Sequence, residues 1–303
     1  MPFFQMFVKI NKEASFVLKK NIPRFIDEKN YALSFGNQWS YFPKTQLDSY
    51  TNVNISETRL KRCLGDFLWN QLKDQKVLEV GCGAGRFTEI LLKYEAKVAS
   101  VDLSTAVEVN ADNFPITENH LVMQADIMNL PFIHNQFDIV ICLGVLQHTP
   151  DPESTVKKLS EQIKKNGHLI IDQYVFNKSY VSLRLLYRQI FKRLPAHTSF
   201  NVIKKMSMFF LPLHKKVKNN KILSILLNRV SPFVTYYSAL PELNDQLQKE
   251  WAMLDTFDTL TDWNKNFGTM RSLRNILTKA GLSVEVCHLN GNGIEARALK
   301  KTI

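Results

Sequence analysis

The sequence predicts an α/β fold in which helices cover a mostly parallel β-sheet. Three observations support this prediction. Short apolar runs alternate with amphipathic segments from residue 76 to residue 173, as in a parallel sheet with crossover helices. The first run ends in a glycine-rich bend, Gly81-Cys82-Gly83-Ala84-Gly85. Near the end of the chain, two further apolar runs flank Asn290-Gly291, which is typical of a β-hairpin.

The elements follow from these patterns in order. A helix is expected over residues 56–73, and another at 86–94 after the glycine bend. Asp151-Pro152 suits the start of a helix, and Asn166-Gly167 is expected to end it. A last helix is expected at 269–280. Seven strands complete the sheet, the last two as an antiparallel hairpin, at 76–80, 97–101, 120–124, 137–142, 168–173, 282–288 and 293–299.

Two carboxylates flank the glycine bend. Glu79 stands two residues before Gly81, and Asp102 closes the next strand. Glycines let the backbone turn sharply and approach a ligand closely, and an ionised Asp can accept from both hydroxyls of a ribose. Arg86 stands where the dinucleotide fingerprint requires its third glycine, so that motif is broken. Glu79 would also repel a pyrophosphate, whereas it suits a cationic amino-acid tail.

With these residues the segment resembles the nucleotide-binding motif of class I S-adenosylmethionine (SAM) methyltransferases. The stretches 137–140 and 144–152 resemble the type 11 methyltransferase domain, found in a large bacterial group that methylates small molecules and cell-surface components. The resemblance covers residues 70–173 strongly and 269–299 weakly. It implies a Rossmann-like fold with SAM as cofactor. The Asn-Pro-Pro-Tyr motif of nucleic-acid base methylases is absent after the fourth strand.

The resemblance also implies which residues hold the methionine part of SAM. The backbone of Gly81, Gly83 and Gly85 should pass beneath it. Glu79 should reach the ammonium group, directly or through water. Leu143 should offer its backbone carbonyl to the same group, with an ordinary buried strand residue as the alternative interpretation.

The nucleoside part of SAM has its own expected partners. Asp102 should accept from the ribose hydroxyls, while Leu103 and Ile127 should pack on the two faces of adenine. Asp126 should accept from the adenine amine. For Asp126 the alternative is the cap of a local turn, and for Leu103 and Ile127 it is a place in the core.

His148 is the candidate catalytic residue. It follows the fourth strand, where the reactive methyl group should point, and its unperturbed pKa near 6.5 suits a proton acceptor at neutral pH. The alternative is a histidine that packs at a helix entry. Asp172 and Tyr174 are weaker candidates, and Asp255 with Asp258 forms either part of an acceptor pocket or a pair of solvated loop carboxylates.

The charge of the chain is concentrated in one segment. Residues 173–241 hold twelve Lys or Arg and no Asp or Glu, whereas the remaining 234 residues hold 27 basic and 28 acidic side chains. Amphipathic helical patterns run through the basic segment. Three interpretations stay open: a helical lid with solvated cations, a surface that lies on an anionic membrane, and an RNA-binding surface.

Composition limits the remaining possibilities. The four cysteines are scattered without C-x-x-C pairs, so we expect neither a metal site nor disulfides, and a reducing compartment fits. We expect no signal peptide and no membrane-spanning run, hence a cytoplasmic protein with possible peripheral contact at the inner membrane. Four segments are expected: an aromatic N-terminal segment at 1–55, the SAM-binding core at 56–173, a basic helical insertion at 174–262 and the rest of the core at 263–303.

Together these patterns favour a SAM-dependent methyltransferase that methylates an oxygen of a small or glycan- or lipid-linked acceptor. One alternative is an RNA methyltransferase, for instance acting on tRNA, that uses the basic insertion. The other is a SAM-binding partner protein without turnover. Nucleic acid is the less favoured partner, because no RNA-binding module is recognisable.

Overall fold

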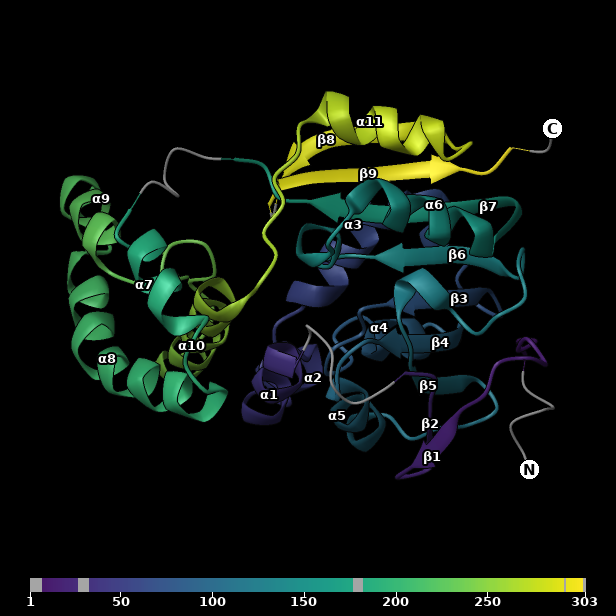
Figure 1. Ribbon diagram of the computed structural model, residues 1–303. Coiled ribbons are helices and arrows are strands. Elements are labelled where there is room, and N and C mark those ends of the chain that lie inside the picture. The colour runs from purple at the N-terminus through teal and green to yellow at the C-terminus, as the bar shows by residue number, and fades with distance from the viewer. Residues whose placement is uncertain (1–6, 27–32, 177–181, 292, 302–303) are drawn as a thin grey trace.

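The computed structural model describes residues 7–26, 33–176, 182–291 and 293–301. Asn292, in the turn of the expected hairpin, lies outside these residues, as do parts of the expected segments 1–55 and 174–262. A large twisted sheet with helices on both faces stands beside a separate group of helices (Figure 1). In this part of the chain no helix combines the length and apolar character needed to cross a membrane.

The sheet has nine strands in the order β1-β2-β5-β4-β3-β6-β7-β9-β8. Seven of them are the expected ones, and the run from β5 to β7 is parallel while β9 and β8 form the antiparallel hairpin. An N-terminal hairpin that the sequence pattern did not predict adds two short strands at the β5 edge. The strands are β1 (Val17–Lys19), β2 (Ile22–Arg24), β3 (Lys76–Val80), β4 (Lys97–Asp102), β5 (His120–Gln124), β6 (Phe137–Cys142), β7 (Ile163–Gln173), β8 (Ser283–Asn290) and β9 (Gly293–Leu299).

Helices cover the two faces because side chains of successive strand residues point to opposite sides. Val77 packs with α3 (Ile55–Trp69) and α4 (Thr88–Lys93). Its neighbour Leu78 belongs to the cluster formed with α6 (Pro152–Gln162) and α11 (Met270–Lys279). Near the β5 edge, Val107 of α5 (Ala106–Asn113) packs against Val122. The central strands are therefore buried on both sides, as their apolar sequences require.

One expected boundary is wrong. The helix that begins at Pro152 ends at Gln162, not at Asn166, and β7 starts at Ile163. Phe137 pairs with Ile163 but Ile139 pairs with His168, so the intervening residues bulge out of the ladder. Asn166 has a left-handed φ of 60°, which fits this bulge better than a helix end.

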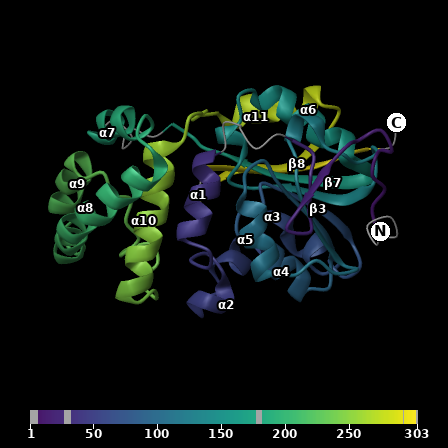
Figure 2. The same cartoon turned by 60° about the horizontal axis from the view of Figure 1, so that its bottom comes forward.

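The separate group consists of α7 (Arg184–Phe191), α8 (Ala196–Val217), α9 (Lys221–Val230) and α10 (Asp245–Thr261). Figures 1 and 2 show α10 between α8 and the N-terminal α1 (Leu33–Tyr41), with α8 and α9 farther from the sheet. Phe257 of α10 is fully buried in this group, and the rings of Tyr41 and Phe200 stack with centroids 3.9 Å apart. The aromatic N-terminal helix thus joins the sheet to the helical group.

Candidate active site

A cavity of about 990 Å³ lies at the carboxyl ends of the central strands. It opens where the strand order reverses: the chain leaves β3 toward β4 and β5, then returns to β6 on the other side of β3. Ligands of open α/β sheets bind at such a switch point, and the volume lies at the upper end of the range for small-molecule sites. Residues of α1, α3, the strand ends and the segment 234–265 line it.

The glycine bend forms one wall of this cavity. Gly81 and Gly83 both line it, with φ of 72° and 52° in the left-handed region. A Cβ on Gly81 would lie 2.2 Å from Val145 Cγ2, and one on Gly83 would lie 2.8 Å from the Trp39 ring. Only glycine fits there without displacing these neighbours. Gly85 instead faces Phe114 and is not part of the lining.

Asp102 holds the bend and also faces the cavity. Its Oδ2 accepts from the Gly83 backbone N–H at 3.0 Å, and its Oδ1 accepts from the Ser104 backbone N–H at 2.8 Å and from the Ser104 hydroxyl at 2.7 Å. Burial raises the pKa of Asp102, although these hydrogen bonds oppose the shift. These hydrogen bonds leave lone pairs of the carboxylate for a ligand. The side chain thus faces the cavity where the ribose is expected, and the ribose contact stays a prediction.

Glu79 is buried beneath the bend, outside the cavity lining. Its carboxylate accepts hydrogen bonds from the hydroxyls of Thr88 and Ser100. Burial raises the pKa of Glu79 to about 7, because these two bonds offset only part of the desolvation. Glu79 would therefore need a bridging water molecule, or a small movement of its side chain, to contact the ammonium group. That contact remains a prediction.

The four remaining cofactor candidates divide into two sets. Leu103, Ile127 and Leu143 line the cavity, as their expected places beside adenine and the ammonium require. Asp126 does not line it: its side chain accepts from the Met128 backbone N–H at 2.9 Å and caps the short helix η2 (Ile127–Asn129). The turn-cap interpretation of Asp126 thus has a structural basis, while its adenine contact stays a prediction.

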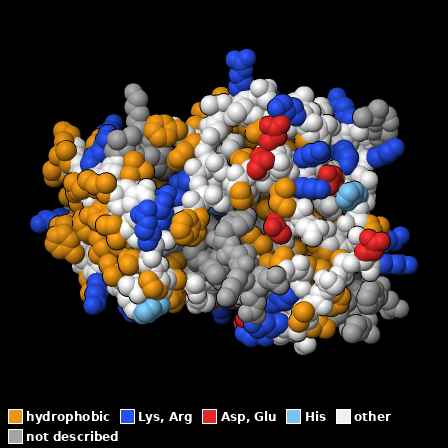
Figure 3. All heavy atoms as spheres, viewed as in Figure 1, with side chains coloured by type: hydrophobic (Ala, Val, Ile, Leu, Met, Phe, Trp, Pro, Cys, Tyr) orange, Lys and Arg blue, Asp and Glu red, His pale blue; other side chains and the backbone are white. Residues whose placement is uncertain are grey.

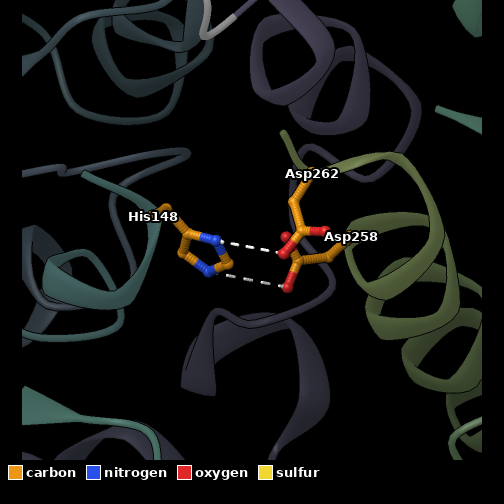
Figure 4. Close-up of side chains that lie close together, drawn as sticks. All are labelled: His148, Asp258 and Asp262. Carbon is orange, nitrogen blue, oxygen red and sulfur yellow. Dashed lines mark ion pairs between the residues drawn. The ribbon is translucent and has the colours of Figure 1, made fainter. Parts of the chain in front are cut away.

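His148, at the end of η3 (Leu146–His148), lines the cavity opposite α10 (Figure 4). Its Nδ1 lies 3.3 Å from the Asn264 carbonyl oxygen and 3.3 Å from Asp262 Oδ2. Both neighbours can only accept, so in the neutral ring Nδ1 carries the proton and Nε2 is the basic nitrogen. Nε2 lies 4.0 Å from Asp258 Oδ2.

The carboxylates beside His148 set its basicity. Burial alone would lower the pKa of His148, but the negative charges of Asp258 and Asp262 outweigh burial and raise it above the ordinary value of 6.5. Burial raises the pKa of Asp258, with the neighbouring Asp262 adding to the effect. The raised pKa makes the unprotonated ring a stronger base toward the proton of a hydroxyl.

Asp262 was not singled out by the sequence. It is anchored from two sides, because Arg188 of α7 donates to its Oδ1 at 2.8 Å and the Lys265 ammonium lies 3.4 Å from its Oδ2. The ligand atoms of His148, Asp258 and Asp262 all lie within 4.8 Å of one another, a spacing that a metal ion could use. The two cations already on Asp262 disfavour a divalent ion there.

α10 corrects the expectation for the acidic pair. Asp255 and Asp258 lie on a helix and line the cavity, so the solvated-loop interpretation is wrong. The Tyr236 hydroxyl donates to Asp255, and burial raises the pKa of that carboxyl to about 6. Arg86 lies over the Trp251 ring with 5.7 Å to its centroid. Aromatic, cationic and acidic groups thus share the half of the cavity that faces α10.

The structure places Asp172 away from a base's position. Its side chain is 1% exposed and outside the lining, pairs with Arg59 of α3, and accepts from the Gly144 backbone N–H at 2.6 Å. Arg59 itself lines the cavity near the glycine bend, which makes it a cation that the sequence analysis missed. Tyr174 also lines the cavity, with its ring 5.8 Å from that of His148.

Comparison with known families gives a match over the core of the sheet. The family described as "Methyltransferase domain" matches residues 78–171. This range runs from the strand before the glycine bend to the fifth strand of the parallel part, and so includes every cofactor candidate.

Similar proteins cover only part of the chain. A ubiquinone biosynthesis O-methyltransferase from Coxiella burnetii is 32% identical over 136 residues, 42% of this chain and 56% of that protein. A tRNA U34 carboxymethyltransferase from Helicobacter hepaticus is 34% identical over 119 residues, 36% and 38% of the two chains. The chain thus spans about half or less of the length of these relatives. A magnesium protoporphyrin IX methyltransferase from Synechocystis, solved with bound SAH, is 14% identical, covers 89% of this chain and 97% of its own, and has a TM-score of 0.49.

Proposed function

Because residues 78–171 form a methyltransferase domain of the class I, SAM-dependent family, we propose that this chain transfers a methyl group from SAM to a hydroxyl oxygen of a small, glycan-type or lipid-linked acceptor. One observation carries the proposal. His148 faces the same cavity as the glycine bend, and its Nδ1 lies between two acceptor oxygens, so in the neutral ring Nε2 is the nitrogen that can accept a proton.

The residues of the cavity fit SAM as cofactor. The bend at Gly81 and Gly83 allows close backbone approach, Asp102 offers carboxylate oxygens suited to a ribose, and Leu103 with Ile127 offers apolar surface suited to a purine. Arg59, which is paired with Asp172, also lines the cavity and is a candidate hydrogen-bond donor to the carboxylate of the methionine part.

Bound SAM would supply a methyl carbon that is electrophilic because it is attached to a sulfonium. His148 Nε2 accepts the proton of the acceptor hydroxyl as the oxygen–carbon bond forms and the carbon–sulfur bond breaks, with the electron pair of that bond left on sulfur. Asp258 and Asp262 stabilise the imidazolium that results. Most of the rate should come from positioning the two reactants and excluding water, with the base adding to it.

The part of the cavity that faces α10, which we call the acceptor half, is suited to a polyhydroxylated substrate. Asp255 and Asp258 present carboxylate oxygens that accept from hydroxyl groups, and Tyr236 and Trp251 present rings suited to the apolar face of a sugar. RNA is supported less, because these groups are acidic and aromatic, and Lys265, which also lines the cavity, is paired with Asp262.

The proposal is tested by measuring SAM binding and then transfer. Calorimetry with the purified protein should show SAM binding that Asp102→Ala weakens strongly while the far-UV circular dichroism spectrum is unchanged. Labelled SAM and cell extract separated into lipid, glycan and RNA pools should then yield label in the lipid or glycan pool. Label in RNA alone, or SAM binding with no transfer to any pool, would contradict the proposal.

A further inference from the structure

The helical group carries an apolar surface that nothing in the described part of the chain covers. α9 contributes no buried residue, although most of its side chains are aliphatic. Ile222 is 72% exposed and Leu226 59%, and on α7 Leu186 is 63% exposed. Figure 3 shows hydrophobic side chains gathered over α7, α8 and α9, with Lys and Arg among them. We call this surface the lid face and define it by its exposed apolar residues: Leu185, Leu186, Ile190, Met208, Phe209, Ile222, Leu223, Ile225, Leu226 and Val230.

Such a surface is too apolar for a face that only meets water. Amphipathic helices of a monomeric protein bury their apolar side, as α8 does with Ile203 and Leu211 against α10. α9 has no such partner among the described residues. A contiguous exposed apolar patch of this kind is typical of an interaction site with another molecule or a membrane.

The charge around the lid face selects the partner. Residues 173–241, which contain α7, α8 and α9, hold twelve Lys or Arg and no acidic residue. Lys216, Lys218 and Lys221 lie exposed in and around the connection from α8 to α9. A second copy of the chain docked through the same face would bring these cations together. The partner must therefore be anionic and able to accept apolar side chains.

A bilayer surface meets both conditions better than RNA does. RNA attracts the cations through its phosphates, but protein–RNA contacts to bases use aromatic rings, and the exposed side chains of α9 are aliphatic. A bilayer with acidic headgroups accepts aliphatic side chains at the headgroup boundary and cations at the phosphates.

We propose that the lid face docks on the surface of an anionic lipid bilayer. The exposed apolar side chains of α7, α8 and α9 insert at the headgroup boundary, and the lysines in and around the connection from α8 to α9 contact headgroup phosphates. Arg184, Tyr236 and Leu240 of the same basic segment line the cavity, so docking would bring the cavity close to the bilayer. The link to a lipid-linked acceptor rests on the proposed function. Docking itself requires neither SAM nor acceptor, so the two proposals can fail separately.

The first test measures binding of the full chain to sedimented vesicles without SAM. Binding to phosphatidylcholine vesicles that contain phosphatidylglycerol should exceed binding to phosphatidylcholine alone and should weaken as salt is added. The triple variant Lys216→Gln, Lys218→Gln, Lys221→Gln should lose about tenfold or more in partition coefficient. Its matched control, Lys12→Gln, Lys157→Gln, Lys165→Gln, removes three exposed cations from the sheet body and should bind as the parent does.

The second test concerns the apolar side chains. Ile222→Ser with Leu226→Ser should weaken vesicle binding, whereas Phe67→Ser, which removes a 68% exposed side chain of α3, should not. The far-UV circular dichroism spectrum and the thermal unfolding midpoint of each variant should be unchanged, which shows that the fold is intact without relying on SAM binding. Equal binding to neutral and anionic vesicles, equal loss in the controls, or a stable dimer that the Ile222 and Leu226 substitutions dissociate would overturn the proposal.

Discussion

The two halves of the cavity are built in different ways. The cofactor half consists of loops at the ends of successive parallel strands, and the residues that the sequence assigns to the cofactor lie between Glu79 and Leu143. The acceptor half is assembled from His148, Tyr236 and α10, which are far apart in the chain. Local backbone geometry thus defines one half, and packing between distant helices defines the other. A substitution in one half should therefore impair the function of that half and leave the other half intact.

The largest expected effect isolates the cofactor half. Gly83→Leu places a side chain at a left-handed φ of 52° and 2.8 Å from the Trp39 ring. The strain and the collision should displace the bend, so SAM affinity measured by calorimetry should fall about 100-fold or more. Methyl transfer should be lost with it.

Gly281→Leu is the matched control for Gly83→Leu. Gly281 also has a left-handed φ, of 79°, but nothing lies within 4 Å of its Cβ position and it is remote from the cavity. This variant carries similar backbone strain and should keep full SAM affinity. Equal loss in both variants would mean that strain on the fold, not the cofactor half, explains the result.

The next largest effect is expected when the proposed base is removed and the cofactor half is left intact. His148→Gln should lower kcat by about 10²–10⁴-fold, the usual contribution of a positioned base, while SAM affinity stays that of the parent. His134→Gln, which changes an exposed histidine paired with Glu161, is the control and should retain full activity. A fall in SAM affinity for His148→Gln would place this residue in the cofactor half instead.

The sequence predicted the strands and the glycine bend that form the cofactor half well, for a physical reason. Its residues are fixed by strand ends and by a bend that only glycine can form, and both features are visible within a few residues of sequence. The strands at 76–80, 120–124 and 137–142 have the expected bounds. Placement of individual side chains was harder: Glu79 within β3, Gly85 after β3 and Asp126 after β5 do not line the cavity.

The acceptor half was predicted poorly because its signal spans several helices. Asp255 and Asp258 were noticed as a pair, yet Asp262 completes the spacing i, i+3, i+7 that marks one face of a helix. The two interpretations of the pair, an acceptor pocket or solvated loop carboxylates, do not draw on that periodicity. For Arg188, no local pattern could reveal that it anchors Asp262 from another helix.

A smaller effect on SAM affinity is expected from the ionisation of Glu79, which lies beneath the glycine bend of the cofactor half. Its pKa of about 7 in the SAM-free protein means that it is partly protonated at neutral pH. A nearby ammonium favours the carboxylate, so SAM binding should release a proton, and affinity should rise about tenfold between pH 6 and pH 8. Glu79→Gln should make the affinity nearly independent of pH over that range.

Calorimetry in buffers of different ionisation enthalpy measures the released proton directly. 5′-Methylthioadenosine, which lacks the ammonium group, is the control ligand, and its affinity should not change with pH in the parent protein. If both ligands respond equally to pH, the titrating group belongs to the nucleoside end, where burial also raises the pKa of Asp102.

The smallest expected effect is a shift in the pH dependence of the methyl-transfer rate, caused by a substitution in the acceptor half. Asp258 raises the pKa of His148, and activity requires the unprotonated ring, so the rate should rise with pH through a midpoint above 6.5. Asp258→Asn removes that negative charge, less of the ring is protonated at a given pH, and the midpoint should move down by roughly one pH unit. Asp255→Asn removes the same charge one turn earlier on α10, where the carboxylate accepts from Tyr236 instead, and should leave the midpoint in place. Because both residues line the cavity, both variants weaken acceptor contacts, and only the midpoint separates the partner of the base from a group that merely binds the acceptor. Equal midpoints in the three proteins would show that His148 does not act as the base.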